Sequence, residues 1–90
     1  MQLLIRVPEI EELPALSELC LRSKAVWGYD VAFMAACRAE LTFDPGDLMS
    51  SRIAVAARGT DILGVAQVRS IGTDADLQKL FVEPAALRSG

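Results

Sequence analysis

Hydrophobic and polar positions follow a helical period in the first half of the chain. A short apolar run over residues 3–7 is closed by a proline, which cannot donate to a ladder, so the run predicts a first strand. After it, four apolar side chains recur at helical spacing: Leu13, Leu16, Leu19 and Cys20. Three glutamates precede them, where the helix dipole favours anions, and together these features predict a helix over about residues 11–24.

A glycine-interrupted stretch over residues 26–30 separates this helix from a second one. Asp30 is a suitable N-cap, and the alanine-rich segment behind it predicts a helix over about residues 31–42. The turn signal Asp44-Pro45-Gly46-Asp47 closes the helical half of the chain.

After this turn the hydrophobic residues no longer follow a helical period. Three segments read as strands, over about residues 52–58, 62–71 and 76–82, and short glycine-containing turns separate them. Gly64 inside the middle strand indicates a bulge or a close backbone approach. Alternation predicts that Asp76, Gln78, Leu80 and Val82 share one face of the last strand, opposite Leu77, Lys79 and Phe81. The expected class is α/β (α+β), with the order β-α-α-β-β-β and an antiparallel strand meander.

Composition narrows the functions that this fold can carry. Hydrophobic residues make up 52% of the chain and charged residues 23%, which indicates a folded domain. The net charge of −3 and the lack of a basic stripe argue against nucleic acid as a ligand. There is no apolar run of membrane-spanning length, and no signal peptide is recognisable, so a cytoplasmic protein is expected.

The two cysteines do not suggest a metal site or a nucleophile. Cys20 and Cys37 lie in helix-like apolar segments without Cys-x-x-Cys spacing, and the chain contains no histidine. We expect small core residues in a reducing compartment, although a disulfide between them is an alternative. No metal is expected.

The order of elements, with Ile62-Leu63-Gly64-Val65-Ala66 and Leu80-Phe81-Val82-Glu83-Pro84, resembles the first half of the GNAT superfamily of N-acetyltransferases. In that family a loop of pattern Gln/Arg-x-x-Gly-x-Gly/Ala follows the strand, and its amides bind the acetyl-CoA pyrophosphate at a helix N-terminus. Here Leu87-Arg88-Ser89-Gly90 takes that place, with Leu87 at the Gln/Arg position. We therefore expect one partial GNAT domain over residues 1–90, with a truncated phosphate loop at 85–90.

The resemblance also implies roles for single residues in acetyl transfer. Counted back from the loop, Asp76 falls where some members carry the general-base glutamate, which would require burial to raise its pKa. The alternative is a solvated carboxylate at a strand end. Backbone groups of Leu80, Phe81 and Val82 correspond to those that pair with the pantetheine of the cofactor, and these residues can at the same time be ordinary core residues.

An acceptor site is implied beside the first two helices. Ser23 to Tyr29 is similar to the segment that overlies the acceptor in small bacterial GNAT proteins, which makes Trp27 and Tyr29 candidate substrate-binding residues. They can equally be core aromatics. The resemblance does not distinguish a peptide amine from a small-molecule amine.

Two functions follow from the resemblance. The first is an acetyl-CoA-dependent N-acetyltransferase that is incomplete or inactive as the isolated chain and is completed by a second copy or a complementing C-terminal half. The second is a non-catalytic interaction domain derived from an acetyltransferase, which self-associates. Exposed strand edges favour pairing, so a homodimer is expected in either case.

Overall fold

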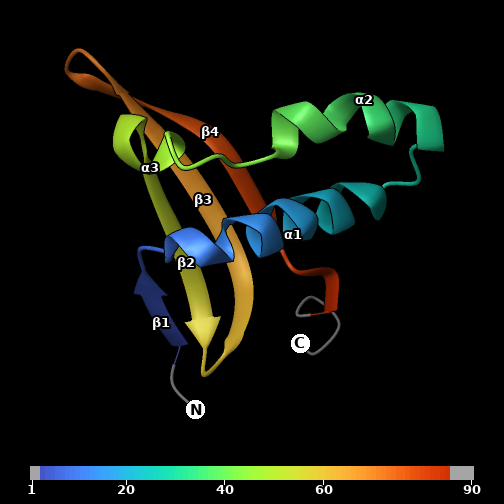
Figure 1. The fold of residues 1–90 in the computed structure, drawn as a ribbon, viewed down its shortest axis with the longest axis horizontal. Coiled ribbons are helices and arrows are strands. Elements are labelled where there is room, and N and C mark those ends of the chain that lie inside the picture. The colour runs from blue at the N-terminus through green and yellow to red at the C-terminus, as the bar shows by residue number, and fades with distance from the viewer. Residues whose placement is uncertain (1–2, 86–90) are drawn as a thin grey trace.

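Four strands form one antiparallel sheet in the order in which they occur along the chain (Figure 1). The computed structural model describes residues 3–85. The strands are β1 (Leu3–Arg6), β2 (Arg52–Arg58), β3 (Asp61–Ile71) and β4 (Asp74–Val82). The helical segments between β1 and β2 are η1 (Ile10–Glu12), α1 (Leu13–Ala25), α2 (Val31–Leu41) and α3 (Asp47–Ser50). The fold class and the antiparallel meander predicted from the sequence are confirmed.

Local sequence signals account for the starts of the two long helices. Pro14 lies in the first turn of α1, where its missing N–H is not needed. A 3-10 turn precedes it, in which Glu9 and Glu12 form a capping box. Asp30 caps α2, because its carboxylate accepts a hydrogen bond of 2.7 Å from the backbone N–H of Phe33.

One element was missed, and two strands begin earlier than predicted. The turn signal at residues 44–47 continues into α3, a single helical turn. β3 begins at Asp61 and β4 at Asp74, because each hairpin loop contains only two residues. Gly59 and Gly72 stand first in these loops with φ of 62° and 61°, a conformation that glycine adopts without strain.

A register shift in the β3–β4 hairpin overturns the strict alternation predicted for β4. Lys79 pairs with Gln67, but Leu77 pairs with the next residue, Val68, so Gln78 is an extra residue on β4. Since Gln67 and Val68 point to opposite faces of the sheet, their partners Lys79 and Leu77 do too. Alternation had put these two partners on the same face, because nothing in the hydrophobic pattern marks the bulge.

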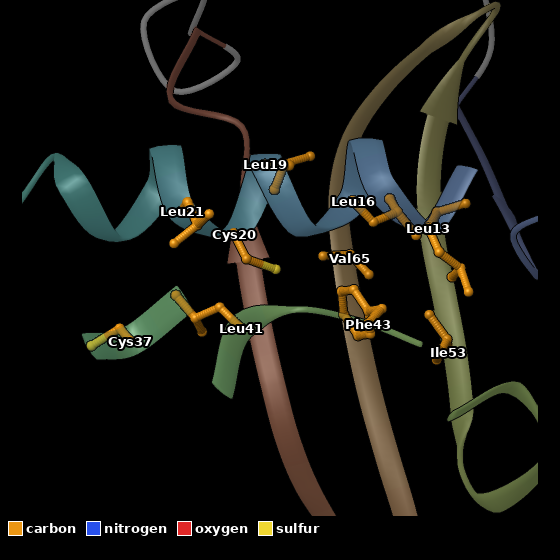
Figure 2. Close-up of a cluster of buried hydrophobic side chains, with 11 residues drawn as sticks. Leu13, Leu16, Leu19, Cys20, Leu21, Cys37, Leu41, Phe43, Ile53 and Val65 are labelled. Carbon is orange, nitrogen blue, oxygen red and sulfur yellow. The ribbon is translucent and has the colours of Figure 1, made fainter. Parts of the chain in front are cut away.

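The hydrophobic core lies between α1 and one face of the sheet (Figure 2). Leu16 and Cys20 of α1 are fully buried over Val55 of β2 and Val65 of β3. Leu41, at the end of α2, and Phe43, just after it, close this layer from below in the view of Figure 2. Burial of these side chains is the main source of stability for a chain of this size.

The opposite face of the sheet, called the open sheet face below, is apolar and exposed. The pairing of β1 with β2 places Leu3 and Ile5 on it, and the pairing of β3 with β4 adds Leu80 and Val82. All four side chains are exposed. They border a shallow cavity of about 370 Å³ whose floor is made of small residues of β2 and β3. No helix within residues 3–85 covers this face (Figure 1).

Candidate functional site

The outer edge of β4 has no strand partner within residues 3–85. The N–H of Glu83 donates to the carbonyl oxygen of Leu63 on β3 at 2.8 Å. Because N–H and C=O groups alternate in direction along a strand, the groups of Phe81 also face β3, while those of Leu80 and Val82 face outward. We call these outward N–H and C=O groups of Leu80 and Val82 the open β4 edge.

β3 and β4 approach each other closely at Gly64. A Cβ atom at this position would lie 3.2 Å from the carbonyl oxygen of Phe81, closer than most side chains tolerate. Gly64 pairs with Val82, and a register shift in the neighbouring β2–β3 pairing lies beside it. The close approach predicted for this glycine is confirmed. It places the backbone of Phe81 firmly against β3.

The side chain of Phe81 is half-buried and packs against the core, whereas that of Leu80 is 64% exposed on the open sheet face. Of the three residues predicted to bind a cofactor through their backbone, Leu80 and Val82 therefore turn their backbone groups away from the sheet, and Phe81 turns its own toward β3. Their role in binding stays a prediction. Leu87, Arg88, Ser89 and Gly90, the predicted phosphate-loop residues, lie outside the described part of the chain.

An ion pair ties the end of β4 to α1. Arg22 contacts both carboxylate oxygens of Glu83, Nη2 to Oε2 at 2.6 Å and Nε to Oε1 at 3.3 Å. The hydrogen bond with Arg22 lowers the pKa of Glu83 and raises that of Arg22, although burial opposes both shifts. Sequence reasoning missed this pair, since its partners are 61 positions apart.

Asp76 lies near the start of β4 and is exposed. Its carboxylate accepts a hydrogen bond from the side-chain amide of Gln78. The burial that a general base would need at this position is not present among the described residues, and the exposure agrees with a solvated carboxylate. The role of Asp76 as general base stays a prediction.

Trp27 and Tyr29 lie on the α1–α2 connection, where Gly28 has a φ of 81°. Both are exposed, Trp27 at 79% and Tyr29 at 48%, so neither is a core aromatic. The Tyr29 and Phe33 rings pack at 4.5 Å between centroids, and the Lys24 ammonium lies 5.9 Å and 5.6 Å from them. Lys24 and Phe33 are additional members of this surface, which the sequence analysis did not name.

Gln67 is the one fully buried polar side chain with a large volume in the described core. Its amide donates to the Ser51 hydroxyl and its carbonyl accepts from the Lys79 ammonium, each at 3.0 Å. The Lys79 ammonium also lies 5.2 Å from the centre of the Phe43 ring. These contacts satisfy every buried polar atom of Gln67, which indicates a structural role.

The cysteines behave as the sequence predicts for core residues. Cys20 and Cys37 are buried and free, so they form no disulfide. Burial raises the pKa of Cys20 to about 11, which keeps the thiol protonated and unreactive. Residues 3–85 contain no cluster of three or more metal-ligating side chains. In the same range, no helix is long and apolar enough to cross a bilayer.

A comparison with solved structures supports the fold, whereas comparisons of sequence found no match. No family model and no curated protein sequence matches the chain. Among solved structures, the chain is similar to the PaiA N-acetyltransferase of Thermoplasma acidophilum, whose structure was determined in complex with coenzyme A. The TM-score is 0.77 at 19% sequence identity, and the match covers 94% of this chain.

The match spans 61% of the length of the PaiA chain. The described fold is therefore similar to part of the fold of that PaiA structure. At this identity the likeness establishes the fold, and the activity of this chain is a separate question.

Proposed function

We propose that the chain is an acetyl-CoA-dependent N-acetyltransferase module that binds its cosubstrate along the open β4 edge. The observation that carries the proposal is the outward direction of the N–H and C=O groups of Leu80 and Val82 on an edge strand of an acetyltransferase fold. An unpaired edge binds an extended amide-containing ligand as an added strand does, with main-chain hydrogen bonds and little dependence on side chains. The pantetheine arm of coenzyme A carries two such amides.

The reaction proposed is direct transfer of the acetyl group. The acceptor nitrogen attacks the thioester carbonyl carbon and a C–N bond forms. The C–S bond breaks and coenzyme A leaves as the thiolate, while the amine proton passes to a base or to water and a proton from solvent converts the thiolate to the thiol. Asp76 is the base we would test first. Trp27 and Tyr29 would contact the acceptor, a small-molecule or peptide amine, because they present exposed aromatic area beside α1 and α2. The free cysteines favour a reducing compartment, which leads us to assign the activity to the cytoplasm.

A second candidate function, a self-associating interaction domain, is favoured by the open sheet face. The chain exposes 6234 Å², whereas a compact monomer of 9.7 kDa exposes roughly 5,100 Å². The chain therefore exposes more surface than a compact monomer of its mass. A homodimer or a complementing chain that covers Leu3, Ile5, Leu80 and Val82 would bury this apolar surface.

Isothermal titration calorimetry with acetyl-CoA tests the first proposal. Val82→Pro removes one outward N–H, and proline is tolerated on an edge strand where that group is not part of the ladder. Loss of one hydrogen bond corresponds to about 1 kcal/mol, so the Kd should rise about fivefold. Val82→Ala keeps the N–H and removes only side-chain atoms, and it is the matched control that should bind within about twofold of the wild type.

The two candidate functions predict different results in these experiments. An enzyme module binds acetyl-CoA and discriminates Val82→Pro from Val82→Ala. A pure interaction domain gives no heat with acetyl-CoA at millimolar concentration, yet sediments as a dimer in analytical ultracentrifugation. Leu80→Glu, which puts a charge on the open sheet face, should then shift it to the monomer.

A further inference from the structure

Glu83, the residue directly after β4, is held from two sides. Its backbone N–H bonds to Leu63 of β3, and its carboxylate bonds to Arg22 of α1. Pro84 follows, which restricts Glu83 to an extended conformation. The end of β4 is thus fixed relative to both the sheet and the helix, and the open β4 edge ends only one residue earlier, at Val82.

The pair with Arg22 has the better geometry of the two ion pairs made by arginines of the α1–α2 hairpin. Arg38 meets Glu18 through a single contact of 3.3 Å between exposed side chains. Arg22 makes two contacts with Glu83, whose side chain is only 20% exposed. Bidentate pairing with a partly desolvated carboxylate fixes orientation as well as distance.

Arg22 also lines two cavities in the surface. One is a cavity of about 360 Å³ between α1 and α2, and the other, of about 610 Å³, is bordered by α1, the β2–β3 hairpin and Glu83. Of the residues that line either cavity, Arg22 is common to both. Phe81 packs against the core under α1, and the ion pair adds a second link between α1 and the end of β4, beyond the last strand residue.

We propose that Arg22 is a positioning residue: by holding the Glu83 carboxylate it keeps the open β4 edge aligned for an acyl-CoA ligand. The inference rests on the proposed function, and it adds a residue of α1 that touches neither cosubstrate nor reacting atoms. A main-chain site depends on the position of its backbone groups, because a small displacement lengthens several hydrogen bonds at once. Loss of the pair therefore weakens binding without removing any binding group.

Calorimetry of the full chain with acetyl-CoA tests this assignment. Arg22→Met keeps the aliphatic stem and removes the charge, and Glu83→Gln removes the charge from the other side. Each should raise the Kd about five- to tenfold. The double variant should match either single variant, because both changes break one contact. Arg38→Met, the matched control in the same hairpin, should stay within about twofold of the wild type.

Amide hydrogen exchange gives a readout that does not depend on the ligand. The Glu83 N–H should exchange faster in Arg22→Met and Glu83→Gln than in the wild type or in Arg38→Met. Unchanged acetyl-CoA binding by Arg22→Met, fully additive losses in the double variant, or unchanged exchange at Glu83 would each overturn the positioning role while the proposed function stands. Absence of acetyl-CoA binding by the wild type would overturn the proposed function itself, and the positioning role with it.

Discussion

Replacing Ser17 tests how α1 is joined to the segment that follows α2. Its hydroxyl is buried in α1, donates to the carbonyl of Leu13 at 3.0 Å and accepts from the backbone N–H of Phe43 at 2.8 Å. The second bond ties the segment after α2 to α1. In Ser17→Ala the Phe43 N–H stays in the interior without that partner.

The expected loss follows from these contacts. A buried donor without a partner costs about 1–3 kcal/mol, and alanine returns about 0.5 kcal/mol through its higher helix propensity. The net destabilisation should be about 0.5–2.5 kcal/mol. With a urea m-value of about 1 kcal/mol/M for a domain of this size, the unfolding midpoint, followed by circular dichroism, should fall by roughly 0.5–2.5 M.

Ser23→Ala is the matched control for Ser17→Ala. Ser23 also lies in α1 and is half-buried, and its hydroxyl makes no hydrogen bond with the described residues. It should show only the propensity gain, so the difference between the two variants isolates the bond to Phe43. A Ser17→Ala midpoint within 0.3 M of the control, or equal exchange of the Phe43 N–H in both, would refute the reasoning (about 0.3 kcal/mol at this m-value).

Two further predictions concern the periphery of the fold. The Arg6–Glu12 pair lowers the pKa of Glu12 from 4.5 to about 2. The stabilisation of the folded state by this pair is therefore complete above pH 4.5 and is lost as the pH falls toward 2. Glu12→Gln should flatten the acid side of the curve of unfolding free energy against pH, and an unchanged slope would contradict this account. Gly72→Ala should lower stability by about 1 kcal/mol because φ is positive at this position, whereas Thr73→Ala in the same turn should cost less than about 0.5 kcal/mol in thermal unfolding.

Much of the fold could be predicted because its signals are local. The spacing of Leu13, Leu16 and Leu19 reports which side of α1 is buried, and Asp30 marks the start of α2 because capping involves only neighbouring residues. Gly64 signalled the close approach of β3 and β4 for a similar reason, since the absence of a side chain is visible in the sequence.

The candidate site could be predicted only in part. The sequence pointed to Leu80, Phe81 and Val82 as a group, but hydrogen bonding to β3 separates Phe81 from the other two. It left Trp27 and Tyr29 open between core and surface, and their exposure excludes the core. Helical spacing alone does not reveal this, because whether a helix connection is covered depends on distant parts of the chain.

By itself, the sequence determined the four strands, the two long helices, their order and the residues able to form a core, since these follow from periodicity and from short-range turn and cap chemistry. Tertiary structure alone decided the bulge at Gln78, which reverses the faces predicted for the start of β4. It also decided the pairing of Arg22 with Glu83, two charged residues that have many possible partners along the chain. Both depend on how β3, β4 and α1 are placed in space, and no local pattern encodes a contact between residues 61 positions apart.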